Sequence, residues 1–188
     1  DTVAPSFFIF VIVAGLTFAS AAKSLLFNII RGIINSQTKD GDKPMNINIR
    51  HIAEQDKPQI LEMMRVFYAS DAVFTNGSEE IFNADIDNCI GDNPYIEGYV
   101  FEGDGGILGY AMLAKSFSTE FGKPCIWIED IYVKEEYRGL GIGSRFFDFI
   151  EEKYPHSLFR LEVEAENERA LSVYRKCGYD LLPYMEMK

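Results

Sequence analysis

The chain has few basic residues for its length. Its 188 residues include 18 Lys and Arg against 29 Asp and Glu, which gives a formal net charge of −11 at pH 7. This balance excludes the basic surface that nucleic-acid binding requires, so we expect no nucleic-acid partner. A net acidic field favours cationic ligands such as amines, although acidity also serves solubility alone.

Cysteine is scarce as well. Cys89, Cys125 and Cys177 are odd in number and show no C-x-x-C spacing. The sequence therefore predicts neither a disulfide framework nor a structural zinc site, and we expect no metal. Such cysteine usage is typical of a reducing compartment, so we expect a cytoplasmic protein.

Residues 1–44 differ from the rest of the chain. Residues 4–22 read APSFFIFVIVAGLTFASAA and carry no charge. An apolar segment of this length is enough to cross a bilayer as a helix. The Lys and Arg residues that follow would place the next part of the chain on the cytoplasmic face. A cleaved signal peptide, a buried helix and translated upstream sequence ahead of Met45 remain alternatives. We expect membrane association only if this segment is a genuine anchor, and we expect residues 45–188 to form the functional domain.

Hydrophobic periodicity from Met45 onward predicts one α/β (α+β) domain. The expected elements are a strand at 46–52, helices starting near 56 and after 78, two strands within 95–117, a strand at 124–133, a helix at 143–154, a strand at 158–165, a helix at 167–177 and a strand near 184–188. The strand–helix–strand order in the second half predicts a parallel pair with a crossover helix, whereas the preceding strands form an antiparallel meander. We therefore expect a mixed central sheet with flanking helices.

A glycine-rich segment separates the most apolar strand from a helix. Residues 135–147 read EEYRGLGIGSRFF and place three glycines within five positions. Backbone N–H groups can converge there, and the positive end of the following helix adds to their attraction for phosphate. The lack of a following Gly-Lys-Ser/Thr excludes a P-loop, and G-x-G-x-G differs from the dinucleotide fingerprint. The alternative is a tight strand–helix connection without a ligand.

The segment RGLGIG at residues 138–143 resembles the R/Q-x-x-G-x-G/A signature of the GNAT superfamily of acyl-CoA-dependent N-acetyltransferases. The segment NERALSVYRKCGY at 167–179 is similar to the next signature of that family. The segment IEDIYVKEEYRGLGIGS at 128–144 is most similar to the small-amine, spermidine/spermine-like branch. The resemblance covers residues 45–188 and implies a GNAT-like fold, in which two parallel strands splay apart to admit acetyl-CoA.

The resemblance also implies roles for single residues. It places the general base at Glu129 and the general acid at Tyr174. Asp130, the next residue in the strand, is the alternate base. Because neighbours in a strand face opposite sides, we expect only one of the two carboxylates to point at the substrate. The acetyl-CoA contacts that the resemblance implies are Ile131, Tyr132, Val133, Arg138, Gly139, Leu140, Gly141, Ile142, Gly143, Ser144, Asn167, Ala170 and Tyr174.

The implied activity is acetyl transfer from acetyl-CoA to a primary amine of a small molecule, by direct attack in a ternary complex. An acetyl-cysteine route is less favoured, because Cys177 lies at a helix C-terminus where the dipole opposes a thiolate. Two alternatives stay open: acetylation of a protein N-terminus or lysine, and a non-catalytic acyl-CoA-binding sensor. A homodimer is one option for the assembly.

Overall fold

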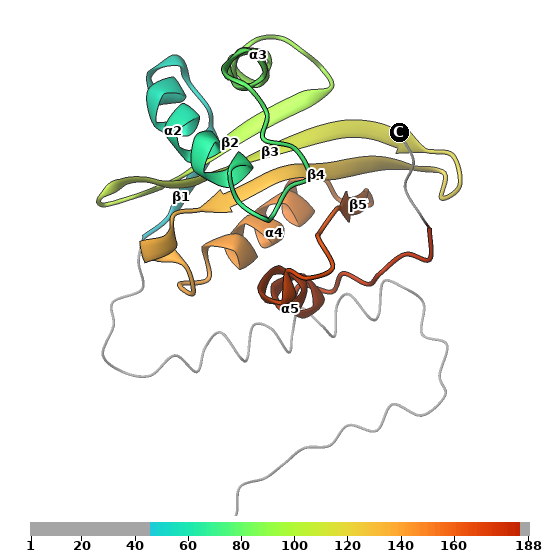
Figure 1. Cartoon of the computed structure of the whole chain (residues 1–188). Coiled ribbons are helices and arrows are strands. Elements are labelled where there is room, and N and C mark those ends of the chain that lie inside the picture. Colours follow the sequence, from blue (N-terminus) through green and yellow to red (C-terminus); the bar gives the residue numbers. More distant parts are fainter. Residues whose placement is uncertain (1–45, 185–188) are drawn as a thin grey trace, which may run out of the picture. The chain divides into compact units, whose positions relative to one another are not determined.

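The computed structural model describes residues 46–184, which contain a five-stranded mixed sheet with helices on both faces (Figure 1). The strands are β1 (Asn48–His51), β2 (Ile96–Gly103), β3 (Gly106–Ser118), β4 (Lys123–Val133) and β5 (Leu158–Leu161), in that order across the sheet. Neighbours from β1 to β4 are antiparallel, and β5 pairs with β4 in parallel. The predicted mixed sheet is therefore confirmed.

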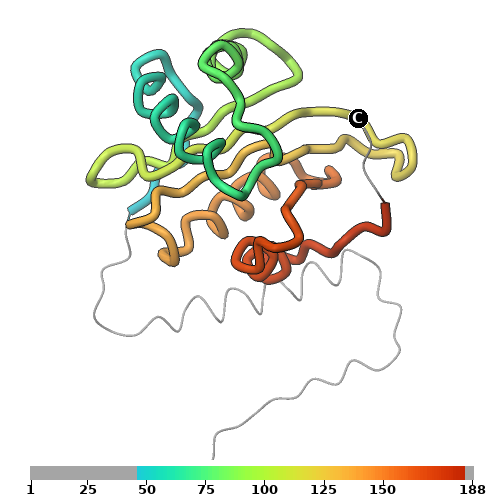
Figure 2. Tube along the Cα trace, viewed as in Figure 1, coloured from blue at the N-terminus to red at the C-terminus, as the bar shows by residue number. Residues whose placement is uncertain are grey.

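Two helices cover each face of the sheet. Helices α2 (Lys57–Tyr68) and α3 (Glu79–Ile90) lie on one face, whereas α4 (Ile142–Lys153) and α5 (Glu168–Lys176) lie on the other (Figures 1 and 2). Two short 3₁₀ turns, Glu54–Asp56 and Glu135–Tyr137, precede α2 and the glycine loop.

Local signals explain where α3 and α5 begin and where α5 ends. The Ser78 hydroxyl accepts a hydrogen bond from the backbone N–H of Ile81 at 3.2 Å, and Asn167 caps α5 in the same way through Ala170 N–H at 3.1 Å. After α5 the chain turns at Gly178, whose φ of +89° is a left-handed conformation that suits glycine. These boundaries agree with the helix signals in the sequence.

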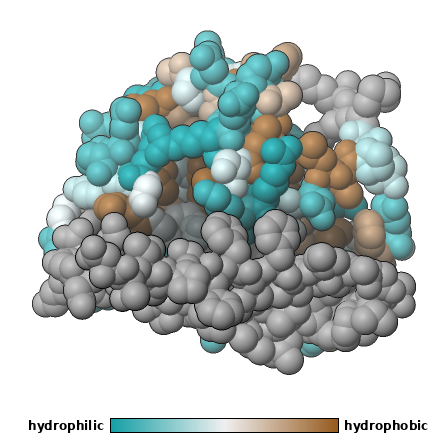
Figure 3. Space-filling view, turned by 90° about the horizontal axis from the view of Figure 1, so that it is seen from below, coloured by the Kyte–Doolittle hydropathy of each residue, from teal (hydrophilic) through white to brown (hydrophobic). Residues whose placement is uncertain are grey.

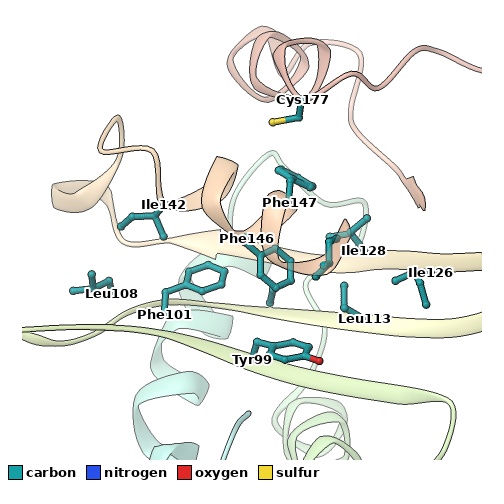
Figure 4. Close-up of a cluster of buried hydrophobic side chains, with 12 residues drawn as sticks. Tyr99, Phe101, Leu108, Leu113, Ile126, Ile128, Ile142, Phe146, Phe147 and Cys177 are labelled. Atoms are coloured by element: carbon teal, nitrogen blue, oxygen red, sulfur yellow. The ribbon is translucent and has the colours of Figure 1, made fainter. Parts of the chain in front are cut away.

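Large apolar side chains gather between the layers. Among the coloured residues in Figure 3, hydrophilic residues predominate and hydrophobic residues lie among them. Figure 4 shows Phe146 of α4 pointing toward Tyr99 and Phe101 of β2, whereas Phe147 points toward α5, and all four side chains are fully buried. Each such burial stabilises the fold by about 1.5–3 kcal/mol. This cluster fixes α4, and therefore the loop in front of it, against the sheet.

The sheet differs from the sequence-based prediction at its β5 edge. Strand β5 ends at Leu161, four residues short of the predicted end at 165. The described residues do not include 185–188, which belong to the last predicted strand. They also do not include residues 1–44, so the hypotheses on that segment stay predictions. Within residues 46–184, no helix combines the length and apolar character needed to span a bilayer.

Candidate active site

The two parallel strands separate after a short paired region. Residues 125–128 of β4 pair with 158–161 of β5, and β4 then continues to Val133 with only β3 beside it among the described residues. A cleft of 2310 Å³ opens along this separation. The splayed parallel strands expected from the resemblance are therefore present, and they leave one edge of residues 129–133 facing the cleft.

The glycine loop forms one end of this cleft. Gly139 and Gly141 have φ values of +84° and +78°, and a Cβ at either position would meet no atom within 4 Å. The backbone conformation, rather than lack of space, therefore requires glycine at both positions. Gly141 is also the N-cap of α4, and within the described residues no side chain caps that helix end. A helix N-terminus of this kind attracts an anion through its backbone N–H groups and its dipole.

Arg138 connects the loop to the end of β4. Its Nε donates a hydrogen bond to the carbonyl oxygen of Val133 at 2.8 Å, and its guanidinium carbon lies 5.6 Å from the centre of the Tyr132 ring. Ile142 is buried in the core at 2 % exposure, although it also borders the cleft. Leu140 is half exposed and is the single predicted site residue that does not line the cleft.

A one-residue bulge in β4 is located at Glu129. In the β3–β4 ladder, Met112 pairs with Asp130 and Leu113 pairs with Ile128, so that Glu129 has no residue opposite it. Such a bulge interrupts the alternation of side chains between the two faces. Glu129 and Asp130 both line the cleft. The expectation that only one carboxylate would point at the substrate assumed a regular strand, and β4 is not regular at this position.

Two phenols bind the buried carboxylate of Asp130. The hydroxyl of Tyr68 donates to Oδ1 at 3.1 Å and that of Tyr110 donates to Oδ2 at 3.0 Å, while Asp130 is only 5 % exposed. Burial raises the pKa of Asp130 to about 6, and the two hydrogen bonds oppose part of this rise. The sequence offered no sign of Tyr68 or Tyr110 as site residues, because they come from α2 and β3, far along the chain from β4.

Tyr174 of α5 packs on α4, the helix that follows the glycine loop. Its ring meets the Phe147 ring edge-on with the centroids 5.8 Å apart, and one helical turn later the Cys177 Sγ lies 3.9 Å from the Ser144 hydroxyl. Burial raises the pKa of Tyr174, so the phenol stays protonated at neutral pH. Asn167 and Ala170 line the same part of the cleft. The cap hydrogen bond of Asn167 uses its Oδ1 and leaves the Nδ2 hydrogens for other partners.

Several acetyltransferases share this sequence pattern and fold. Residues 59–179 match the family model described as acetyltransferase (GNAT) family. The chain is 34 % identical over 146 residues to thialysine N-epsilon-acetyltransferase of Sus scrofa. The alignment covers 71 % of this chain and 84 % of that protein. A possible acetyltransferase from Clostridium difficile 630 matches with a TM-score of 0.60 at 20 % identity, over 76 % of this chain and 99 % of the other.

An aminoglycoside N-acetyltransferase in complex with CoA matches with a TM-score of 0.62 at 12 % identity, over 79 % of this chain and 97 % of the other. At these identities the solved structures establish the shared fold. The family match covers more than half of the chain, and the similarity to the Sus scrofa enzyme supports it independently. The chain belongs to the GNAT family of acetyltransferases.

Proposed function

We propose that this protein transfers the acetyl group of acetyl-CoA to a primary amine of a small molecule, by direct attack in a ternary complex in the cytoplasm. The observation that carries the proposal is one continuous cleft with a glycine loop at one end and two carboxylates beside it. The relative from Sus scrofa is named for acetylating thialysine, a small amine, which supports the acceptor class.

The residues of the cleft fit acetyl-CoA. The backbone N–H groups of residues 139–144 would hold the diphosphate, since they require no basic side chain in this acidic protein. The open edge of β4 at Ile131 and Val133 would pair with the amide groups of the pantetheine arm, as an added strand does. When bound, acetyl-CoA supplies the acetyl group as an activated thioester.

Glu129 is the better placed of the two candidate bases. An aliphatic amine has a pKa of about 10.4 and must lose a proton before it can attack. Glu129 is exposed to solvent, so it can take that proton directly or through a water molecule and release it to bulk solvent. Both oxygens of Asp130 already accept hydrogen bonds from phenols in a buried site. We therefore assign proton removal to Glu129 and a field effect to Asp130.

Tyr174 is the proposed general acid. Its phenol remains protonated because burial raises its pKa, and its hydroxyl can give that proton to a departing thiolate. The location of Tyr174 in the wall of the same cleft supports this role. Glu129 and Tyr174 would thus complete a proton transfer in which the amine loses one proton and the thiol gains one.

A substrate panel tests the proposal. Purified full-length protein is incubated with acetyl-CoA and with polyamines, amino acids, aminoglycosides or peptides, and the release of CoA thiol is measured. We expect turnover with one or more of the small amines and a loss of that turnover in Glu129→Gln. Turnover with peptides alone would favour protein acetylation, and CoA binding without any turnover would favour a sensor. Either result would contradict the proposed function.

A further inference from the structure

A second polar feature lies along the same cleft, beyond the two carboxylates. Arg160 of β5 is paired in register with Trp127 of β4, and both residues line the cleft. The guanidinium carbon is 5.5 Å from the centre of the Trp127 ring and 5.7 Å from that of the Phe121 ring. The Arg160 side chain is 21 % exposed. Two aromatic rings therefore hold this cation in the wall of the cleft, where cation–π attraction orients it.

The hydrogen-bonding capacity of Arg160 is only partly used. Its Nε is buried, and no acceptor within the described residues bonds to it. Glu120, its ion-pair partner, is 53 % exposed, and the closest atoms, Nη2 and Oε2, are 3.8 Å apart. Glu120 also accepts a hydrogen bond from the hydroxyl of Tyr184 at 2.8 Å. A buried guanidinium donor without an acceptor is costly, and the planar fork of Arg matches a carboxylate.

The position of Arg160 relative to Glu129 sets the length of a ligand that could reach both. Arg160 lies opposite Trp127, which precedes Glu129 by two residues on β4. Two residues along the strand and one strand spacing across separate the two backbones by about 8 Å. The guanidinium extends toward Phe121, in the turn between β3 and β4, and thus away from the glycine loop. The two charged groups are therefore well separated along the cleft.

We propose that Arg160 binds a carboxylate of the acceptor, so that the enzyme selects amines that carry a carboxylate several atoms away from the reacting nitrogen. This inference rests on the proposed function and assigns the specificity within it. The α-amine of an amino acid is too close to its carboxylate to reach Glu129 while that carboxylate pairs with Arg160. An ω-amino acid of the lysine type has the required separation, and Arg160 offsets the acidity that otherwise repels a carboxylate.

The test compares two acceptors that differ in the carboxylate alone, lysine and its decarboxylated analogue cadaverine. Dissociation constants are measured by calorimetry on CoA-saturated protein, and kcat/KM is measured by thiol release. Because a charge-assisted hydrogen bond is lost, Arg160→Gln should lower the lysine-to-cadaverine ratio of kcat/KM by about 10- to 100-fold and raise the ratio of the two dissociation constants by the same factor. Arg160→Lys keeps the charge without the fork and should give an intermediate ratio.

A second variant tests the same site without replacing Arg160. Glu120→Gln removes the carboxylate that competes for Arg160, so the lysine-to-cadaverine ratio of kcat/KM should rise several-fold. If Arg160 has a purely structural role, this ratio should not change. If no amine of the substrate panel is acetylated but Arg160→Gln still weakens lysine binding selectively, the carboxylate site stands and the proposed function fails. Acetylation of both amines with a ratio insensitive to Arg160 and Glu120 overturns the carboxylate site and leaves the proposed function intact.

Discussion

The charge of Asp130 controls the field around Glu129. Burial raises the pKa of Asp130 to about 6, so this carboxyl is mainly neutral at pH 5 and mainly charged at pH 7.5. The charged form attracts the ammonium form of an acceptor. We expect kcat/KM for a cationic amine to increase as the pH rises through about 6. In Asp130→Asn this step should be absent. The control Asp92→Asn, at an exposed position outside the cleft, should retain the step. If Asp130→Asn also retains it, the step does not come from Asp130.

The same raised pKa predicts a pH dependence of stability. Ionisation of Asp130 opposes folding as the pH rises from its usual pKa of 3.8 to the folded value of about 6. The stabilising contribution is therefore fully present below pH 3.8 and is lost above about pH 6. Relative to Asp130→Asn, the free energy of unfolding of the natural protein should fall by about 2–3 kcal/mol between these limits. Urea titrations at several pH values measure this difference, and parallel curves would contradict the burial argument.

Tyr174 should matter through its hydroxyl. Tyr174→Phe keeps the ring contact with Phe147 and removes the proton donor, so kcat should fall by about 10²- to 10⁴-fold with little change in the KM for acetyl-CoA. Tyr179→Phe is the matched control, because its ring also packs on Phe147 at 5.3 Å. Steady-state kinetics with a good amine acceptor separate the two variants. An equal loss in both would indicate a packing effect instead of acid catalysis.

At the scale of secondary-structure elements, the start of α4 presents the amides of the glycine loop to the cleft. In Gly141→Ala, a Cβ would meet no atom, but the φ of +78° is unfavourable for alanine by about 1–2 kcal/mol. The loop would leave its binding conformation, so the dissociation constant for CoA should rise by roughly 5- to 30-fold. Gly143 has no positive φ, and its added Cβ would lie 3.9 Å from Ile131 Cδ1. Calorimetry should show near-normal CoA affinity for Gly143→Ala, and equal affinities of the two variants would contradict the strain argument.

The sequence predicted the helix boundaries well where the residues that set them lie next to the helix in the chain. The caps at Ser78 and Asn167 and the stop at Gly178 lie within a few residues of the helices they limit. The bulge at Glu129 could not be predicted, because it is defined by the register with a neighbouring strand. The phenols around Asp130 and the aromatic rings around Arg160 depend on contacts between distant segments. The sequence therefore indicated most elements and the reaction, but not the environment of the charged groups.

At the scale of the whole molecule, Glu97 joins β2, β3 and the end of α4. Its carboxylate accepts hydrogen bonds from Lys115 at 2.8 Å and Lys153 at 2.9 Å, and from the hydroxyls of Tyr99 and Tyr154. Burial alone would raise the pKa of Glu97, but these four donors outweigh it and hold the pKa well below its usual value. The network links the central strands to the helix that follows the glycine loop.

Loss of this carboxylate should destabilise the fold in a pH-dependent way. Because the folded pKa of Glu97 is lowered, its contribution is fully present above the usual value of 4.5 and declines as the pH falls below it. Glu97→Gln should cost about 3 kcal/mol at pH 7, since it leaves two ammonium groups underpaired, and less at pH 3. Glu102→Gln, at a partly exposed position where the carboxylate pairs with Arg50, should cost much less. Thermal or urea unfolding measures both, and a pH-independent loss in Glu97→Gln would argue against the ion network.

The irregular position in β4 also affects how this strand can change in length. Deleting the codon for residue 129 would remove the extra residue and leave Ile128 opposite Leu113 and Asp130 opposite Met112, so no side chain would change faces. Deleting the codon for residue 127 would instead bring Glu129 opposite Leu113, into the core position of Ile128 beneath α4. Within this strand a shortened chain should therefore fold best when it lacks the candidate base itself.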